Sequence, residues 1–293
     1  MKNILVTGSN GQLGQELQEL SKLFSSYRFH FYNRSELDIS DTAQVNKVLV
    51  ETAPDYCINC AAYTAVDKAE SERETAFAIN GSGPGNLAAA CKQTDTRFIH
   101  ISTDYVFEGS GSEAYREEDV TGPLGVYGAS KLEGEAQAMA ANPDVVIIRT
   151  SWVYSIYGAN FVKTMIRLMG TRPGISVVAD QWGSPTWAAD LASAIMTIIS
   201  GPQWVPGIYH YSNEGRINWF QFADAIREYT GSSCTVAPIT TEQYPTPAPR
   251  PKNSLLSKEK IQQTFGVAIQ PWKASLHACL DRLAAVEGLN LLK

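Results

Sequence analysis

Residues 3–17 read Asn-Ile-Leu-Val-Thr-Gly-Ser-Asn-Gly-Gln-Leu-Gly-Gln-Glu-Leu, and the rest of the chain builds on the unit that they predict. An apolar run of strand-forming residues comes first, followed by glycines at positions three apart: Gly8, Gly11 and Gly14. Leucines then recur at helical spacing: Leu13, Leu17 and Leu20. A strand, a glycine turn and a helix direct the unpaired N–H groups of the first helical turn at an anion, and glycine lets the backbone approach it closely. Residues 3–17 therefore predict a turn that cradles a pyrophosphate.

The glycine spacing is Gly-x-x-Gly-x-x-Gly, which differs from the Gly-x-Gly-x-x-Gly of the common dinucleotide fingerprint. On the glycines alone, an ordinary turn between a strand and a helix is the alternative. The preceding strand and the following helix supply the context that the fingerprint requires. With Thr7 before the first glycine, the turn resembles the cofactor loop of extended short-chain dehydrogenases.

The composition is that of a folded globular chain of 293 residues, 44% apolar and 18% charged, with a net charge of −6. This charge argues against a broad nucleic-acid-binding surface, which would be basic. No apolar stretch is long enough to span a bilayer, and the N-terminus enters a strand without the features of a signal peptide. We therefore expect a cytoplasmic protein with no nucleic-acid or membrane partner.

Five cysteines are scattered along the chain, and Cys57 and Cys60 form a Cys-x-x-Cys pair. This pair falls in an apparent strand, where positions three apart point to opposite faces. No second pair completes a zinc site. We expect thiols without a shared role at all five positions: Cys57, Cys60, Cys91, Cys234 and Cys279.

Strand-like and helical patterns alternate at least five times before residue 150, which predicts a parallel sheet with helices on both faces. The expected class is α/β, a Rossmann-like doubly wound parallel sheet with a smaller C-terminal α/β lobe. In this interpretation residues 1–150 form the dinucleotide-binding domain, with a segment near 180–210 returning to it. Residues 151–293 form mainly the second, substrate-binding lobe.

One helix is expected to include Ala76–Asn80 and, after the glycine-rich Gly81–Gly85, Leu87–Cys91. Further along, the proline-dense segment Tyr244–Pro251 can form neither a regular helix nor a central strand.

The end of the second predicted strand, at residues 33–35, is where a dinucleotide fold meets the adenosine ribose. An acidic residue at this point favours NAD, whereas Arg34 and Ser35 offer a cation and a donor suited to a 2′-phosphate. A solvent-exposed turn arginine is the alternative. Asp38, followed by Ile39, is expected beside the adenine.

Thr103, Tyr127 and Lys131 are the predicted catalytic residues. Tyr127 and Lys131 are four apart and so share one face of a helix, while Thr103 ends a strand at the edge where α/β sheets bind ligands. A free tyrosine titrates near pH ~10, and a nearby ammonium lowers that value. A pKa lowered by about three would correspond to roughly 4 kcal/mol and would suit the phenol to acid–base catalysis near neutral pH. Because Tyr-x-x-x-Lys is common by chance, the alternative is a core aromatic residue and a surface lysine.

Seven stretches, distributed over about residues 2–285, carry a resemblance to a known family. They are the glycines of residues 8–14 and the segments Ala61–Glu70, Ser102–Phe107, Tyr127–Lys131, Arg149–Tyr154, Asp180–Thr186 and Arg250–Ser254. With them the chain resembles the extended short-chain dehydrogenases and, among these, the dTDP-4-dehydrorhamnose reductases.

The resemblance implies a reduction in which NADPH, or NADH, delivers hydride to the C4 ketone of dTDP-4-dehydro-L-rhamnose. Tyr127 would protonate the C4 alkoxide, Lys131 would lower the pKa of Tyr127 and hold the nicotinamide ribose, and Thr103 would position the ketone oxygen. The expected cofactor-binding residues are Gly8, Gly11, Gln12, Leu13, Gly14, Arg34, Ser35, Asp38, Ile39, Ala61, Ala62, Tyr63, Thr64, Ser102, Tyr127 and Lys131. The expected residues for the dTDP-sugar are Val66, Thr103, Asp104, Tyr105, Tyr127, Trp152 and Arg250.

Arg250 is the expected partner of the substrate diphosphate, because a guanidinium forks onto phosphate oxygens. An arginine that anchors its own loop is the alternative. Some members of the family are dimers bridged by a divalent metal that glutamates hold, and Glu16 matches one such position. The loop at residues 187–190 reads Trp-Ala-Ala-Asp, and the chain ends at residues 291–293 without an acidic residue. We therefore expect no metal, in a monomer or a homodimer.

Two other functions remain open. A nucleotide-sugar dehydratase or epimerase shares the fold, but such dehydratases carry an Asp-Glu pair after the strand-end threonine, and here Asp104 is followed by Tyr105. A non-catalytic regulatory subunit, similar to that of methionine adenosyltransferase, would hold NADPH without oxidising it. The presence of the predicted catalytic residues favours an enzyme over this binding module.

Overall fold

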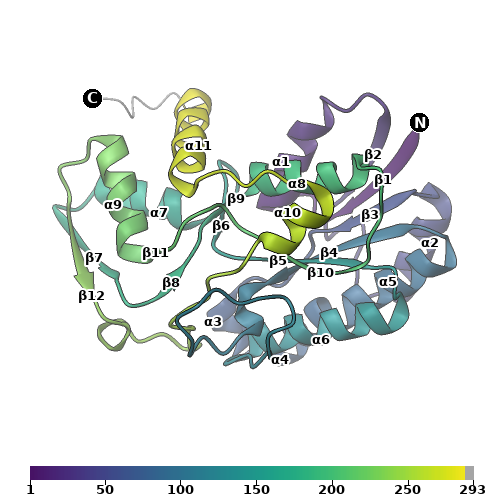
Figure 1. The fold of residues 1–293 in the computed structure, drawn as a ribbon, viewed down its shortest axis with the longest axis horizontal. Coiled ribbons are helices and arrows are strands. Elements are labelled where there is room, and N and C mark those ends of the chain that lie inside the picture. Colours follow the sequence, from purple (N-terminus) through teal and green to yellow (C-terminus); the bar gives the residue numbers. More distant parts are fainter. Residues whose placement is uncertain (288–293) are drawn as a thin grey trace.

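The computed structural model describes residues 1–287, and its centre is a six-stranded sheet (Figure 1). From edge to edge the order is β10-β5-β4-β3-β1-β2, and every neighbouring pair is parallel. The strands are β1 (Lys2–Thr7), β2 (Tyr27–Tyr32), β3 (Tyr56–Asn59), β4 (Arg97–Thr103), β5 (Val146–Thr150) and β10 (Gly207–Tyr211). Parallel neighbours need crossover connections, which helices supply. The predicted Rossmann-like α/β class is confirmed.

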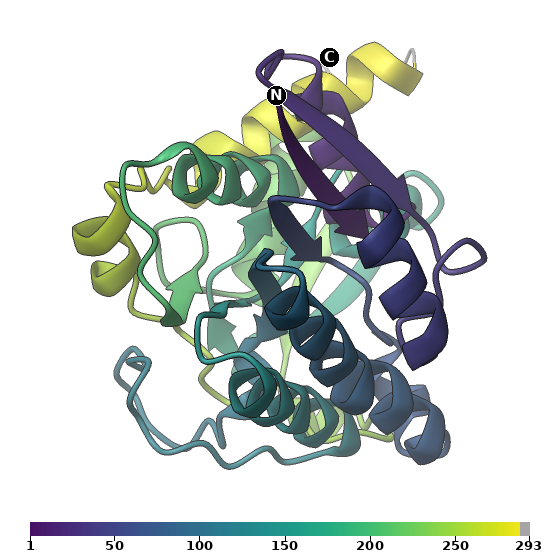
Figure 2. The same ribbon diagram turned by 90° about the vertical axis from the view of Figure 1, so that its right-hand side faces the viewer.

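Helices cover both faces of the sheet because successive strand residues point to opposite sides. They are α1 (Gln12–Ser21), α2 (Thr42–Thr52), α5 (Gly83–Gln93), α6 (Val126–Ala141) and α8 (Ala188–Ser200). Ile4 and Val6 of β1 belong to a buried cluster with α1 and α8, whereas Leu5 belongs to a second cluster with α2, α5 and α6. Figure 2 shows α2, α5 and α6 side by side on their face of the sheet.

The sheet grows in two directions from β1. The chain first adds β2 on one side of β1 and then adds β3, β4 and β5 on the other. In open α/β sheets, ligands bind outside the carboxyl ends of the strands at the point where this direction reverses. Here the reversal falls between β1 and β3, whose carboxyl ends lead into Gly8 and Ala61. The glycine turn therefore lies at the switch point of the sheet.

The helical segment expected across residues 76–91 is present, but it begins earlier and contains a π-helical turn. Helix α4 (Arg73–Phe77) continues through a π-helical turn, η1 (Ala78–Ser82), directly into α5. The glycines are explained by packing, since α5 and η1 lie against α6. A Cβ on Gly83 would lie 2.7 Å from Cδ1 of Ile39, and one on Gly85 would lie 2.9 Å from the side-chain oxygen of Gln137.

A second lobe with its own core lies beside the sheet, at the left of Figure 1. Its main helices are α7 (Phe161–Met169), α9 (Trp219–Thr230) and α11 (Trp272–Glu287). The sequence did not indicate the parallel pair β7 (Gly174–Val178) and β12 (Thr235–Ile239), which packs against α9. Both strands are short and partly exposed, so they lack the strong apolar pattern of the central strands.

Short elements complete the described chain. They are α3 (Val66–Ala69), η2 (Asp104–Val106), β6 (Val153–Tyr154), β8 (Trp182–Gly183), β9 (Thr186–Trp187), β11 (Ile217–Asn218), η3 (Thr241–Gln243) and α10 (Glu259–Phe265). Two elements from the second half of the chain belong to the sheet layers: α8 packs on α1, and β10 pairs with β5.

The cysteines have free thiols throughout the described chain. Cys57 and Cys60 pack into different clusters on opposite faces of the sheet, as expected for positions three apart in a strand. Among residues 1–287, no helix is both long and apolar enough to cross a membrane.

Candidate active site

The glycine turn after β1 is too tight for side chains. Gly8 has a φ of +66°, and a Cβ on it would lie 2.5 Å from the backbone nitrogen of Ala61. A Cβ on Gly14 would lie 2.5 Å from the carbonyl oxygen of Gly8. Gly11 begins α1 as its N-cap residue, and no side chain caps that helix within residues 1–287. The first N–H groups of α1 therefore stay available for an anion, which is what a dinucleotide pyrophosphate requires.

A buried polar network fixes the floor of this turn. Asn59, at the end of β3, accepts hydrogen bonds from Oγ1 of Thr7 at 2.6 Å and from the backbone N–H of Ala61 at 3.1 Å. Its amide nitrogen lies 3.1 Å from Nδ1 of His100. Burial lowers the pKa of His100 well below its usual value, so the ring is neutral. Asn59 was not predicted as a site residue. An asparagine in an otherwise apolar strand nevertheless indicates a buried polar group that needs hydrogen-bond partners.

The loop after β3 is held from the π-helical turn. Asn80 accepts from the backbone N–H of Tyr63 at 2.8 Å and donates to its carbonyl oxygen at 3.0 Å. The same amide donates to Oγ of Ser130 at 3.0 Å, and Ser130 donates to the carbonyl oxygen of Tyr127 at 2.8 Å. Asn80 thus connects the predicted cofactor segment Ala61–Thr64 to the first turns of α6.

The predicted adenosine end of the cofactor site lies after β2. Arg34 and Ser35 are exposed, and Arg34 makes none of the ion pairs found within residues 1–287. Ser35 bonds back to Asn33, donating through both its backbone N–H and its hydroxyl. Asp38 accepts two hydrogen bonds from Ser40. The guanidinium of Arg34 is therefore the group of this turn that is left available for a phosphate.

Thr103 and Tyr127 meet at the carboxyl edge of the sheet. Thr103 ends β4 and is 5% exposed, and Tyr127 is the second residue of α6. Helix α6 comes so close to η2 that a Cβ on Gly128 would lie 2.2 Å from the carbonyl oxygen of Tyr105. The rings of Tyr105 and Tyr127 pack edge to face with centroids 5.5 Å apart.

The pKa of Tyr127 does not fall as the sequence led us to expect. Burial raises the pKa of its phenol to about 12, against the opposing effect of the Thr103 side chain, and the Asp104 carboxyl raises it further. Lys131 is not among the groups that shift this pKa, and its ammonium donates to the carbonyl oxygen of Ile101 at 2.7 Å. Burial also lowers the pKa of Lys131 to about 8, although the Glu135 carboxylate acts in the opposite direction.

Ser102 faces away from this edge. Its hydroxyl donates to Glu135, which also accepts three hydrogen bonds from the guanidinium of Arg149. All three residues are at most 3% exposed. The side chain of Ser102 is therefore committed to a buried network below the site, and only its backbone is left for the predicted cofactor contact.

Asp104 is a buried acid with one unused oxygen. It is 1% exposed, and its Oδ1 accepts from the Thr103 hydroxyl at 3.0 Å. Its Oδ2 has no hydrogen-bond partner within residues 1–287. Burial raises the pKa of Asp104 to about 6, with the hydroxyls of Ser254 and Thr103 acting against it. A buried polar atom without a partner marks a place where a ligand hydroxyl can bind.

Trp152 sits at the junction between the sheet and the second lobe. Its φ of +48° lies in a region that side chains rarely adopt. Its ring stacks on Trp219 with centroids 3.7 Å apart, and a Cβ on Gly183 would lie 2.9 Å from it. A bulky residue held in such a backbone conformation points to a functional constraint.

Arg250 is paired with protein rather than open to solvent. Its two terminal nitrogens lie 2.5 and 3.0 Å from the carboxylate oxygens of Asp67, and one also donates to the carbonyl oxygen of Ala248. Asp67 is the second residue of α3, which begins at Val66. The anchoring role that we weighed for Arg250 is thus present, and a phosphate would have to share or displace this pairing.

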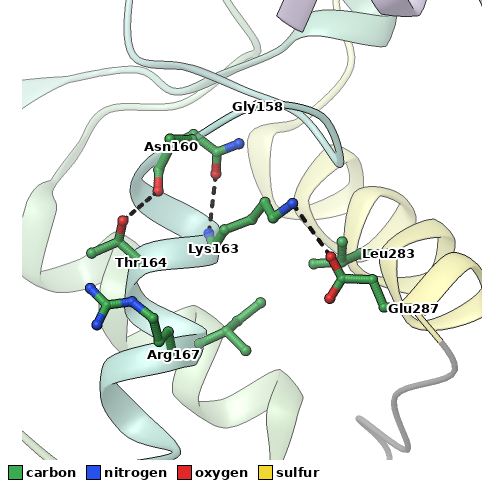
Figure 3. Close-up of a pocket in the computed structure, with 9 residues that line it drawn as sticks. Gly158, Asn160, Lys163, Thr164, Arg167, Leu283 and Glu287 are labelled. Atoms are coloured by element: carbon green, nitrogen blue, oxygen red, sulfur yellow. Dashed lines mark hydrogen bonds and ion pairs between the residues drawn. The ribbon is translucent and has the colours of Figure 1, made fainter.

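A separate cavity lies outside the predicted site. It has a volume of about 370 Å³ and lies between α7 and α11, lined by none of the predicted site residues (Figure 3). Lys163 crosses its mouth to pair with Glu287 at 3.4 Å. Gln12 approaches this region, since it accepts a hydrogen bond from Asn160 and donates to the carbonyl oxygen of Val153. The side chain of Gln12 thus connects α1 to the second lobe.

Glu16, the expected remnant of a metal site, has protein partners. It accepts from the Ser155 hydroxyl at 2.7 Å and pairs with Arg282 at 2.9 Å. Asp190 accepts from Asn213 and Ser275. Residues 1–287 contain no group of three or more acidic, histidine or cysteine side chains placed to hold a metal. Residues 291–293, on which part of the expectation rested, lie outside the described residues.

Together, a doubly wound parallel sheet, a glycine turn at its switch point and a polar, partly buried edge beside it define an oxidoreductase of the Rossmann class. The model of the RmlD substrate binding domain family matches residues 1–285, so the chain belongs to this family, that of the dTDP-4-dehydrorhamnose reductases. A dTDP-4-dehydrorhamnose reductase of Sinorhizobium fredii is 44% identical over 281 residues, covering 93% of this chain and 94% of that protein.

Two solved structures agree with the family. That of a dTDP-4-dehydrorhamnose reductase from Clostridium acetobutylicum has a TM-score of 0.93 and 42% identity, covering 96% of this chain and 99% of that one. That of a dTDP-4-dehydrorhamnose reductase from Bacillus anthracis, in complex with NADP, has a TM-score of 0.92 and 41% identity with the same coverage.

Proposed function

We propose that this protein reduces dTDP-4-dehydro-L-rhamnose to dTDP-L-rhamnose with NADPH. The relatives named dTDP-4-dehydrorhamnose reductase align with almost the whole chain, and the structure of the Bacillus anthracis relative was solved in complex with NADP. The assignment of NADPH over NADH rests on Arg34, the exposed cation after β2.

The cofactor fits the glycine turn. Its pyrophosphate would lie on the N-terminus of α1, where Gly8, Gly11 and Gly14 leave room and the helix dipole favours an anion. Other predicted contacts would come from the N-terminal residues of α1, the turn after β2 and the loop after β3: Gln12, Leu13, Arg34, Ser35, Asp38, Ile39, Ala61, Ala62, Tyr63 and Thr64. When bound, NADPH supplies the hydride that reduces the C4 ketone.

Tyr127 is the proton donor. With a pKa raised to about 12, its phenol keeps its proton at neutral pH, which is the state that a donor needs. The alkoxide formed at C4 is a far stronger base than a phenolate, so transfer to it remains favourable. Thr103 holds the same oxygen through its hydroxyl. The ammonium of Lys131 stabilises the phenolate after transfer, once it turns from the carbonyl oxygen of Ile101 towards the ribose.

The sugar nucleotide lies between the sheet and the second lobe. Oδ2 of Asp104 accepts a sugar hydroxyl, and the stacked ring of Trp152 forms the wall from the second lobe. Val66 and Tyr105 line the same region, and Arg250 contributes positive charge for the diphosphate. In this proposal residues 1–150, with α8 and β10, form the cofactor domain, and most of residues 151–293 bind the substrate.

One arrangement carries the proposal: Tyr127 and the unused oxygen of Asp104 flank Thr103 at the carboxyl edge of the sheet. Asn80 connects this edge to the loop that meets the glycine turn. A dehydratase would need an acid in place of Tyr105, and no observation favours that reaction.

The test is consumption of NADPH, followed by absorbance, with dTDP-4-dehydro-L-rhamnose made in situ from its 4-keto precursor and the epimerase. We expect rapid oxidation by the wild type and at least a thousandfold loss in Tyr127→Phe, with unchanged NADPH binding. A protein that binds NADPH and never consumes it would instead be a regulatory binding module.

A further inference from the structure

The helix that carries Tyr127 has no cap of its own. Its N-cap residue, Gly125, has no side chain, and no acidic residue stands in the first turn of α6. The carboxylate of Glu70 fills this role from 56 residues earlier in the chain: its Oε1 accepts the backbone N–H of Val126 at 2.8 Å. A carboxylate satisfies an otherwise unpaired N–H there and interacts favourably with the positive end of the helix dipole.

Gly125 makes room for this contact. A Cβ on Gly125 would lie 2.6 Å from Oε1 of Glu70, closer than such atoms approach one another. The backbone of Gly125 has no left-handed conformation that would itself demand glycine. Glycine at position 125 therefore leaves the space that the Glu70 carboxylate occupies at the start of α6.

Glu70 is exposed, but contacts of the residues just before it fix the segment that presents it. Ala69 is fully buried and belongs to a small cluster with Ala76 and Val126, against which the Tyr127 ring packs. Two residues before Ala69, Asp67 is tied to the loop of Arg250 by paired hydrogen bonds. The segment that presents Glu70 is therefore fixed to both the helix and the wall of the proposed substrate site.

We propose that Glu70 is a positioning residue that caps α6 from another part of the chain and thereby holds Tyr127 in register with Thr103. Tyr127 is the second residue of the helix, so fraying of the first turn moves its phenol directly. The role of Glu70 in turnover rests on the proposed function, whereas the cap itself does not depend on it.

The first arm of the test is kinetic. We expect Glu70→Ala to lower kcat about tenfold, the size of a lost helix cap, with KM for substrate and binding of NADPH changed less than twofold. Glu70→Gln keeps an acceptor oxygen and should recover most of kcat. Glu74→Ala is the matched control, because Glu74 is an exposed carboxylate on the neighbouring α4 that makes no hydrogen bond or ion pair with α6 within residues 1–287.

The second arm uses Gly125. A Cβ there displaces the Glu70 carboxylate without removing it, so Gly125→Ala should lower kcat about as much as Glu70→Ala. In the double variant the losses should not add, because both changes break the same contact. Losses that multiply would show that Gly125 and Glu70 act separately and would overturn the proposal.

The third arm needs no turnover. Amide hydrogen exchange of residues 126–129 should be at least tenfold faster in Glu70→Ala than in wild type, with thermal unfolding followed to confirm that both proteins are folded. Unchanged exchange and unchanged kcat would overturn the cap. If the wild type never oxidises NADPH but exchange still rises in Glu70→Ala, the proposed reaction fails while the cap stands.

Discussion

Glu135 and Arg149 form an ion pair sealed beneath the candidate active site, with Nη2 of Arg149 2.7 Å from Oε2 of Glu135. Their side chains are 1% and 3% exposed. Glu135 lies one turn beyond Lys131 on α6, and Arg149 lies in β5 beside the end of β4. The hydroxyl of Ser102, next to Thr103, also donates to Glu135. The pair, with Ser102, thus joins β5 to the two elements that carry the predicted catalytic residues, β4 and α6.

Removing one partner of this pair should destabilise the protein strongly, because it leaves an uncompensated charge in the interior. Glu135→Gln and Arg149→Met should each lower the free energy of unfolding by about 3–5 kcal/mol. The double variant should lose less than the sum of both, since it leaves no buried charge. Unfolding in urea provides the measurement, and strictly additive losses would contradict a shared interaction.

The preference for NADPH should depend on Arg34. A hydrogen bond to a charged group contributes about 1.5–3 kcal/mol, so Arg34→Ala should raise KM for NADPH by at least about tenfold. KM for NADH should change little, because NADH lacks the 2′-phosphate. Arg28→Ala, at an exposed position of β2, is the control for a general loss of positive charge. An equal change for both cofactors would exclude a 2′-phosphate contact.

Gly8→Ala should abolish cofactor binding and also lower the stability of the fold. The new Cβ meets the backbone of Ala61 at 2.5 Å, and a φ of +66° adds about 1–2 kcal/mol for a residue with a side chain. The turn must open to make room for the Cβ, and this moves the N–H groups of α1 away from the position of the pyrophosphate. Gly111→Ala, where a Cβ has only one distant neighbour, should bind NADPH normally in a fluorescence titration. Retained affinity in Gly8→Ala would mean that this turn does not form the cradle.

Much of the fold was readable from local patterns. The apolar runs of the central strands and the helical spacing of Leu13, Leu17 and Leu20 lie within a few residues of the structure that they specify. The reason for glycine at residues 81–85 was not readable, because the groups that the glycines pack against, Ile39 and α6, are distant in sequence. Strands β7 and β12 escaped notice because exposure on one side weakens their apolar pattern.

The sequence predicted the candidate site as a set of residues, but it did not predict most of the contacts around them. Motif spacing predicts Thr103, Tyr127 and Lys131 as catalytic residues, but burial rather than the ammonium governs the pKa of Tyr127. The pairing of Lys131 with a carbonyl oxygen 30 residues away has no local signal. The same holds for Asn80 and Glu70, whose partners lie 50 and 56 residues along the chain. Such contacts arise from tertiary packing, which a single sequence does not display.

Lys131 should set the alkaline limit of turnover. Its pKa is lowered by burial to about 8, whereas that of Tyr127 is raised to about 12, so the lysine loses its proton first. Without the ammonium, the phenolate left after proton transfer is less stable, and kcat should fall above about pH 8. Lys131→Arg keeps its charge, because a guanidinium does not lose its proton in this range. In that variant kcat should no longer fall between pH ~8 and pH ~10. A decrease in kcat that persists over this range would show that another group causes it.

The same titration should appear in stability, with a sign that the structure sets. The folded pKa of Lys131, about 8, lies below its ordinary 10.5, so between these values the unfolded chain holds a proton that the folded protein has released. The free energy of unfolding contributed by this site therefore increases as pH rises through that window and is lost again as pH falls through the folded pKa. Urea unfolding of wild type and Lys131→Met at pH 7 and pH ~10 isolates this contribution as the difference between the two proteins. The free energy of unfolding of the wild type should increase relative to that of Lys131→Met as pH rises. A constant difference between the two proteins would mean that Lys131 titrates normally and that burial does not govern its charge.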